Sequence, residues 1–288
     1  MTGVATTIES VILAQDRRNI GLLRPHLPQD YCTQAARFIL AHRGPAIVAT
    51  GFYIAAAGLP ETDGPPGAVA IGRALQALGY PVVYVTDDYV VPLLAGEEER
   101  GARVVAFPQA PPPESRAFAA RLLEEVQPAL CIAIERPGLS ALDDYRNMRG
   151  RDVSARTARV DELFLQHPCT VGVGDGGNEI GMGNLYEVLC GLPQVVPYPA
   201  TTRVSRLVIA SVSNWGGQGL VAALSLLAGR NLLPSEEEEA ALVERMVAVG
   251  AVDGVTGERA PIVDTFPLDE YLSCLRALHA LLRGRGVA

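Results

Sequence analysis

The segment 174–184, with the sequence GDGGNEIGMGN, combines several glycines with carboxyl and amide side chains. It follows the apolar run 170–173, which predicts a buried strand, and a helical pattern resumes directly after it. Glycines let a backbone turn sharply and approach a ligand closely, while Asp175, Asn178 and Glu179 supply polar groups. The segment therefore predicts a ligand site near the N–H groups of a helix start. The alternative is a glycine-rich turn that only links strand to helix.

The rest of the composition favours carboxylates as the proton-transfer groups. All 24 basic residues are arginine, so the chain holds no Schiff-base lysine for pyridoxal phosphate and no Walker A lysine. The four histidines lie outside the glycine-rich loops, which argues against a Ser-His-Asp triad and a histidine-rich metal site. The five cysteines are scattered without a CxxC pair, so neither a disulfide framework nor a zinc-finger spacing is visible.

Length and charge narrow the class of protein. The 288 residues are 49% hydrophobic, which is ample for a large core. A formal net charge of −8 argues against a nucleic-acid-binding surface. No apolar run approaches the roughly 20 residues of a membrane helix, and the first residues lack the pattern of a signal or transit peptide. We therefore expect a cytoplasmic protein that binds neither nucleic acid nor membrane.

Short apolar runs alternate with helical patterns from about residue 44 onward. This alternation predicts an α/β fold with a mostly parallel, Rossmann-like and doubly wound sheet and helices on both faces. The expected strands are 46–50, 82–86, 104–107, 129–134, 170–173 and 207–212. The expected helices between them are 68–78, 91–100, 114–126, 156–166 and 185–189.

Both ends of the chain are expected to be helical. Residues 1–43 predict a helical segment of two helices, packed on the main domain or against another subunit, and residues 44–288 predict a single α/β domain. A homo-oligomer is left open. Ser235 is expected to cap a helix whose first turn holds the solvated glutamates 236–239. A last helix is expected over 268–282.

Ligands in open α/β sheets bind at the carboxyl ends of the strands, so the residues that follow each predicted strand are site candidates. The loop after the first strand holds Glu61, Thr62 and Asp63. Glu135 and Arg136 follow the fourth strand. Arg136 either forms a local ion pair with Glu135 or holds a substrate carboxylate bidentately.

Two further segments add candidates for a substrate pocket. The sixth strand is followed by a Ser-Asn-Trp-Gly-Gly turn with Ser213, Asn214 and Trp215. The single tryptophan either walls a small pocket or plugs the junction between helix and sheet. Arg149 and Arg151 are further candidates to hold a substrate carboxylate.

Taken in order, these segments resemble the C-terminal domain family of D-glutamate cyclases. The motifs that carry the resemblance are TGF at 50–52, the loop 60–67, IERPG at 134–138, NMRG at 147–150, the glycine-rich stretch 172–183 and SNWG at 213–216. The resemblance spans roughly residues 44–229, and it implies a carbon–oxygen lyase that converts D-glutamate to 5-oxo-D-proline with loss of water. Two-domain members carry an additional N-terminal domain, for which this chain is too short, so we expect a stand-alone member.

Cyclisation of glutamate requires its α-amine to attack its γ-carboxyl carbon, which the folded substrate brings close. A base must take a proton from the amine, and an acid must protonate the departing oxygen. We predict that Asp175 or Glu179 is the base and that the other carboxyl, or Asp63, is the acid. Backbone N–H groups at Gly176 and Gly177 are predicted to stabilise the oxyanion.

The other predicted site residues bind the substrate, a small acidic amino acid. They are Glu61, Thr62, Glu135, Arg136, Arg149, Gly176, Gly177, Asn178, Ser213, Asn214 and Trp215. Because a substrate with two carboxylates must enter an acidic site, arginines, helix N-termini or a cation must offset the repulsion. No cofactor-binding motif is predicted, and Mg²⁺ or Mn²⁺ held by Asp63, Asp175 and Glu179 is left open.

Two other classes of function compete with a cyclase. One is a nucleotide- or phosphate-binding enzyme that uses the glycine-rich loop, although the loop matches neither GxGxxG nor GxxxxGK[ST]. The other is a non-catalytic protein that binds an acidic amino acid, since a fold alone never determines function. Nucleotide-dependent thermal stabilisation would favour the first, and binding without product formation would favour the second.

Overall fold

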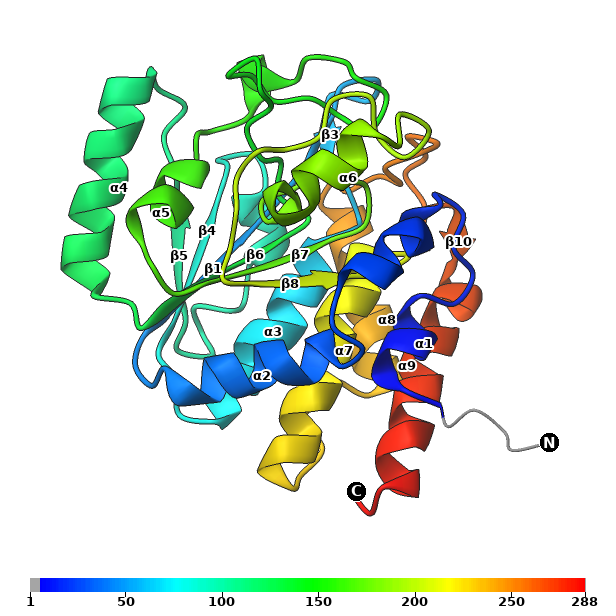
Figure 1. Ribbon diagram of the computed structural model, residues 1–288. Coiled ribbons are helices and arrows are strands. Elements are labelled where there is room, and N and C mark those ends of the chain that lie inside the picture. The colour runs from blue at the N-terminus through cyan, green and yellow to red at the C-terminus, as the bar shows by residue number, and fades with distance from the viewer. Residues whose placement is uncertain (1–5, 288) are drawn as a thin grey trace.

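A computed structural model describes residues 6–287 and contains a central sheet of six parallel strands (Figure 1). The strands occur in the order β5-β4-β1-β6-β7-β8, which is the order of doubly wound dinucleotide-binding folds. Their bounds are β1 Ala46–Thr50, β4 Val82–Thr86, β5 Arg103–Ala106, β6 Leu130–Ile134, β7 Thr170–Gly174 and β8 Arg206–Ile209. The predicted α/β class and parallel sheet are confirmed.

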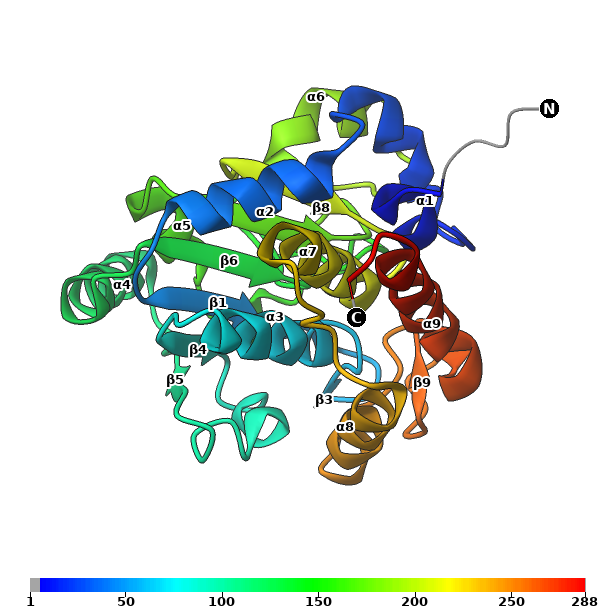
Figure 2. The ribbon, with the colours of Figure 1, turned by 90° about the horizontal axis from the view of Figure 1, so that it is seen from below.

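Side chains alternate between the two faces of the sheet, and each face has its own helices. Ile47 and Val85 join the apolar cluster under α4 (Pro112–Val126) and α5 (Asp161–Gln166). Val48, Tyr84 and Ile132 join the larger cluster on the opposite face. That face is covered by α2 (Tyr31–Ala41), α3 (Pro65–Ala77) and α7 (Ser213–Ala228), as Figure 2 shows. This period-two pattern is what a sheet buried on both faces requires.

The N-terminal segment lies against α7 and β8. It contains α1 (Ile8–Ile12), the 3₁₀ helix η1 (Ile20–His26) and α2. Two helices are predicted for this segment, so the 3₁₀ helix is the additional element. The Tyr31 hydroxyl donates to the Ile209 carbonyl at 2.6 Å, and the Ser211 N–H donates to the Ile12 carbonyl at 2.9 Å. These bonds fix the loop between α1 and η1 close to the carboxyl end of β8.

The C-terminal helices are α8 (Glu236–Ala248) and α9 (Leu268–Gly284). Ser235 caps α8 as predicted, in a capping box with Glu238. The expectation that all four glutamates of this turn are solvated is wrong for Glu239. Its buried carboxyl accepts hydrogen bonds from Gln218 and Tyr271, because α8 turns that side of its first turn toward α7 and α9.

The expected turn at 213–217 is the first part of α7, and the preceding strand ends at Ile209 rather than at residue 212. The glycines there serve packing. A β-carbon on Gly216 would lie 2.6 Å from the Val173 side chain, and one on Gly217 would lie 2.8 Å from Ile134. Glycine therefore lets α7 press directly onto the sheet. The helix expected over 91–100 is also wrong, since only the 3₁₀ turn η2 (Val91–Leu94) forms before a chain of turns.

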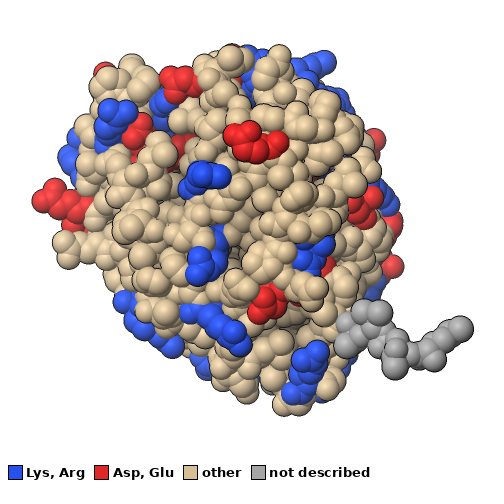
Figure 3. Space-filling model, viewed as in Figure 1, with Lys and Arg blue, Asp and Glu red and all other residues tan. Residues whose placement is uncertain are grey.

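The remaining elements are short. They are β2 Tyr53–Ile54, β3 Leu59–Pro60, η3 Ser154–Arg156, η4 Met182–Leu185, α6 Tyr186–Cys190, β9 Ile262–Val263 and β10 Phe266–Pro267. Acidic and basic side chains are interspersed on the face of the molecule that Figure 3 shows. Among residues 6–287, no helix combines the length and the apolar character needed to cross a bilayer.

Candidate active site

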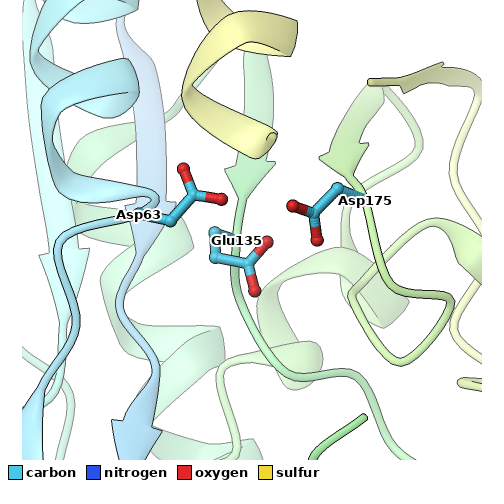
Figure 4. Close-up of side chains that lie close together, drawn as sticks. All are labelled: Asp63, Glu135 and Asp175. Carbon is cyan, nitrogen blue, oxygen red and sulfur yellow. The ribbon is translucent and has the colours of Figure 1, made fainter. Parts of the chain in front are cut away.

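Three carboxyl side chains meet where the strand order reverses between β1 and β6 (Figure 4). They are Asp63, between β3 and α3, Glu135, directly after β6, and Asp175, directly after β7. Each offers an oxygen, and these oxygens lie within 4.8 Å of one another. All three residues are buried. Such a reversal at the carboxyl ends of parallel strands is where ligands bind in open α/β folds.

The N-terminus of α7 holds Asp63. Its carboxylate accepts the backbone N–H groups of Ser213 at 2.9 Å and Asn214 at 2.8 Å, where the helix dipole favours negative charge. Burial and the nearby Asp264 carboxyl raise the pKa of Asp63 to about 7, although the N–H of Asn214 opposes this rise. Asp63 therefore changes protonation near neutral pH.

Glu135 occupies a backbone conformation that few non-glycine residues adopt, with a φ of 40°. The Ser213 hydroxyl donates to its carboxylate. Gly64 packs so closely that a β-carbon there would lie 2.7 Å from that of Glu135. Burial and the charges of Asp175 and Glu179 raise the pKa of Glu135 well above its ordinary value.

Arg18, from the loop between α1 and η1, brings positive charge to the site. Its Nη1 donates to Asp175 Oδ1 at 2.7 Å, and its Nη2 donates to Asp264. Burial alone lowers the pKa of Arg18, but Asp175 and Asp264 raise it well above its ordinary value, so the guanidinium stays charged. The second oxygen of Asp175, Oδ2, is buried and has no hydrogen-bond partner among residues 6–287.

We call Glu61, Asp63, Glu135, Asp175 and Asp264 the carboxyl cluster. All five are buried, and burial is the main reason why the pKa of each is raised. Repulsion from neighbouring carboxylates raises these pKa values further. At Asp175 and Asp264, the positive charge of Arg18 partly offsets the rise. One guanidinium cannot balance five carboxylates in a medium of low dielectric constant. The cluster therefore retains protons at a pH at which isolated carboxyls are ionised.

Glu179 lies beside the cluster but is bound to its own loop. One oxygen accepts the N–H of Gly176 at 2.6 Å and of Asp175 at 3.3 Å, and the other accepts the N–H of Gly177 at 2.8 Å. The proposed oxyanion donors at Gly176 and Gly177 are therefore occupied. These bonds let Glu179 close the glycine-rich loop, and its role in proton transfer stays a prediction.

Asn214 and Thr62 hold the loop that carries Asp63 in place. Asn214 Oδ1 accepts the N–H groups of Gly64 at 2.9 Å and Gly67 at 2.8 Å, and its amide donates to the Thr62 carbonyl. The Thr62 hydroxyl donates to the Ile262 carbonyl at 2.7 Å. These bonds join the Asp63 loop to the start of α7.

Arg136 does not reach the carboxyl cluster. Its fully buried guanidinium pairs with Asp87 and donates to the carbonyls of Gly51 at 3.1 Å and Ala158 at 2.7 Å. These protein partners leave only Nε without a bond among the described residues. The geometry thus gives Arg136 a structural role in place of the expected substrate carboxylate.

Trp215 fills a junction between helices, which is the second of the two roles predicted for it. It is buried, its indole N–H donates to the Tyr271 carbonyl at 3.0 Å, and its ring lies 4.8 Å from that of Phe266. Trp215 therefore joins α7 to β10 and α9.

A cavity of about 70 Å³ lies beside the carboxyl cluster. Glu61, Glu135 and Arg18 form part of its inner wall, together with Asn178, whose amide donates to the Arg146 carbonyl. Arg149, which is exposed, lies on its outer rim. Of the three converging carboxyl residues, Glu135 is the one among the cavity's described lining residues.

The same three carboxyls are where a divalent cation would fit. Among residues 6–287, Asp63, Glu135 and Asp175 are the group whose oxygens converge closely enough to share an ion. The predicted set had Glu179 in place of Glu135, and both oxygens of Glu179 accept loop N–H groups instead. An all-oxygen set suits Mg²⁺ or Mn²⁺, and the buried Asp175 Oδ2 has no hydrogen-bond partner in the described part of the chain.

The sequence matches the model of the D-glutamate cyclase-like, C-terminal family over residues 8–279. The chain belongs to this family. The mitochondrial D-glutamate cyclase of Homo sapiens is 32% identical over 217 residues, which are 67% of this chain and 34% of that protein. The chain thus spans about a third of its relative's length. The solved structure of an exopolyphosphatase-related protein from Bacteroides fragilis aligns with 91% of this chain and 58% of its own chain. The TM-score is 0.43 and the sequence identity is 9%.

Sequence reasoning missed Arg18 and Asp264, which complete the site of this D-glutamate cyclase-like chain. Arg18 lies in a polar loop far from every motif, and Asp264 lies between two-residue strands. The family match begins at residue 8 and so includes Arg18, whereas the motifs that suggested the family begin near residue 44. The left-handed φ of 51° at Asp264 is a signal that only coordinates provide.

Removing the buried charge of Arg136 is expected to destabilise the fold by about 3–5 kcal/mol, because Asp87 is then left buried and unpaired. Urea denaturation of R136M measures this change. The double variant R136M/D87N carries no buried charge there and is expected to regain part of the loss. Equal stability of R136M and the wild type would contradict the structural role.

Asp63 is expected to make stability depend on pH. Its folded pKa of about 7 exceeds its ordinary 3.8, so the native state holds a proton that the unfolded state has released. The contribution of Asp63 is therefore present below pH 4 and is lost as pH rises toward 7. The stability of the wild type relative to D63N, measured by urea denaturation, is expected to fall between pH 4 and 7. A pH-independent difference would contradict the raised pKa.

Proposed function

We propose that this chain is a D-glutamate cyclase-like lyase that converts D-glutamate to 5-oxo-D-proline with loss of water. The observation that carries the proposal is the buried carboxyl cluster, which combines raised pKa values with one charged arginine beside a cavity. Family membership and the activity that the human relative's name states support it.

The reaction needs both a proton acceptor and a proton donor in one site. The ammonium group of the substrate loses one proton before its nitrogen bonds to the γ-carbon and a second proton once that bond has formed. One oxygen of the γ-carboxyl then takes up protons, its bond to carbon breaks, and water leaves. Near neutral pH a cluster of coupled carboxyls contains both ionised and protonated members, so one site supplies both groups.

Glu135 and Glu61 are the members of the cluster that line the cavity, so they contact the substrate in this proposal. Glu135 takes the two protons from the nitrogen in turn and passes each to the departing oxygen, which leaves as water. Asp63 and Asp175 lie behind Glu135 and set its charge, which makes them positioning residues. Arg18 offsets the negative charge of the substrate's γ-carboxyl as it enters.

The competing functions have weaker support in the geometry. A phosphate-binding loop needs free backbone N–H groups, and those of Gly176 and Gly177 are bound to Glu179. A non-catalytic binding protein for an acidic amino acid would use the same cavity, and it is the alternative that an activity measurement decides.

Incubation with D- and L-glutamate, followed by chiral chromatography of 5-oxoproline, tests the proposal. We expect 5-oxo-D-proline from D-glutamate. E135Q is expected to lower kcat about 10²–10⁴-fold, since general acid–base groups contribute on that scale. D175N changes a positioning residue and is expected to shift the pH profile of kcat, because Asp175 sets the charge of Glu135. E187Q, which changes an exposed glutamate on α6, is the matched control and is expected to retain activity. D-Glutamate binding without product would contradict the lyase.

A divalent cation at Asp63, Glu135 and Asp175 is a separate proposal, and its support is their convergent oxygens. A bound cation would stabilise charge that develops on the γ-carboxyl. If the site uses a cation, exhaustive chelation abolishes turnover, Mn²⁺ restores it, and E135Q binds Mn²⁺ more weakly in calorimetry. Full activity after chelation would contradict the cation proposal. The carboxyl groups would then balance their charge by sharing protons.

A further inference from the structure

The cavity beside the carboxyl cluster has an acidic inner wall and a basic outer rim. Glu61 and Glu135 lie on the inner wall and are buried, while Arg149 and Arg151 lie on the rim and are exposed. A ligand with both negative and positive groups would therefore enter the cavity in a preferred orientation.

The rim arginines lie on a turn that is held by specific hydrogen bonds. We call residues 147–151 the arginine turn. Asn147 Oδ1 accepts the backbone N–H groups of both Arg149 and Arg151, each at 3.0 Å, and the Asn147 N–H donates to the Arg151 carbonyl at 2.9 Å. Gly150, with a φ of 75°, closes the turn. One side chain thus fixes the backbone of both arginines before any ligand binds.

The arginine turn carries positive charge that the neighbouring acidic residues do not neutralise. Arg146 pairs with Asp144 and Arg159 pairs with Asp143. Within residues 6–287, neither Arg149 nor Arg151 forms an ion pair, and the Arg149 guanidinium makes one long hydrogen bond, to the Val255 carbonyl at 3.4 Å. Two guanidinium groups are therefore available at the rim to bind an anion.

We propose that Arg149 and Arg151 bind the α-carboxylate of the substrate and thereby make the site prefer substrates that carry this group. This inference rests on the proposed function, in which the amine and the γ-carboxyl face Glu135. The α-carboxylate is the charged group left over, and the acidic inner wall repels it toward the rim. Guanidinium forks bind carboxylates with charge-assisted hydrogen bonds.

The test compares two substrates that differ in the α-carboxylate alone. D-Glutamate carries this group, while 4-aminobutyrate presents the same amine and carboxyl without it and closes to the corresponding lactam. We expect the wild type to have a kcat/KM about 100-fold lower for 4-aminobutyrate. R149Q/R151Q is expected to lower kcat/KM for D-glutamate by about 100-fold, about tenfold per arginine, and to leave that for 4-aminobutyrate nearly unchanged.

Two further variants separate recognition from structure. R37Q removes an exposed arginine of α2 that does not line the cavity, and it is expected to retain wild-type kcat/KM for both substrates. N147A keeps both guanidinium groups but loosens the arginine turn. It is expected to raise KM for D-glutamate with little change in kcat and with no effect on 4-aminobutyrate.

A double variant that keeps wild-type kcat/KM for D-glutamate, or that loses both substrates equally, would overturn this inference. Calorimetric titration with D-glutamate separates that result from failure of the proposed function. If the wild type binds D-glutamate but forms no lactam, a Kd that rises about 100-fold in R149Q/R151Q supports the role of the arginines. An unchanged Kd overturns it. A wild type that neither cyclises nor binds D-glutamate overturns both proposals.

Discussion

Five carboxyl groups buried around one guanidinium are the constraint on which the rest of this structure depends. Removing a carboxylate from water costs far more than the fold can supply from packing, so each charge must be paired, hydrogen-bonded or neutralised by a proton. Arg18 pairs with Asp175 and Asp264, α7 donates N–H groups to Asp63, and Ser213 donates to Glu135. The negative charge that these contacts do not balance raises the pKa values of the carboxyl groups. A site built this way is prepared to accept and release protons near neutral pH.

The fold brings these groups together through the close approach of α7 to the sheet. Gly216 and Gly217 let the helix rest on β6 and β7, and its first N–H groups then point at Asp63. Two members of the cluster, Glu135 and Asp264, have left-handed backbone conformations and buried carboxyl groups. Such conformations persist only where the surrounding structure holds them, which here means Gly64, Ser213 and Arg18. Packing and chemistry thus share the same residues.

Much of the fold was predictable from local patterns. β1 and β4 agree with prediction residue for residue, because each is a short β-branched, apolar run bounded by turn residues. The SNWGG segment was misassigned because glycines that permit close helix–sheet packing look like glycines of a turn. The capping box at Ser235 was predictable because all its contacts lie within one helical turn.

The site was predictable only in part, since spacing along the chain does not show which carboxyl binds its own loop. Glu179 lies close enough in sequence to bond to the N–H groups of Gly176 and Gly177, and Glu135 takes its place beside Asp63 and Asp175. Arg136 has the residue type and position of a carboxylate receptor, yet it pairs with Asp87, which follows β4, two strands away in the sheet. Arg18 reaches the site from a loop that no local pattern connects with it.

Infrared spectroscopy of the carboxyl groups tests the sharing of protons most directly. Difference spectra between the wild type and D63N, recorded from pH 5 to pH 8, isolate the signal of the cluster. A protonated carboxyl band that persists at pH 7 in the wild type and weakens in D63N is the result expected from the buried charges. A cluster whose members are all ionised at pH 6 would contradict it, and the acid–base chemistry assigned to Glu135 would then lose its physical basis.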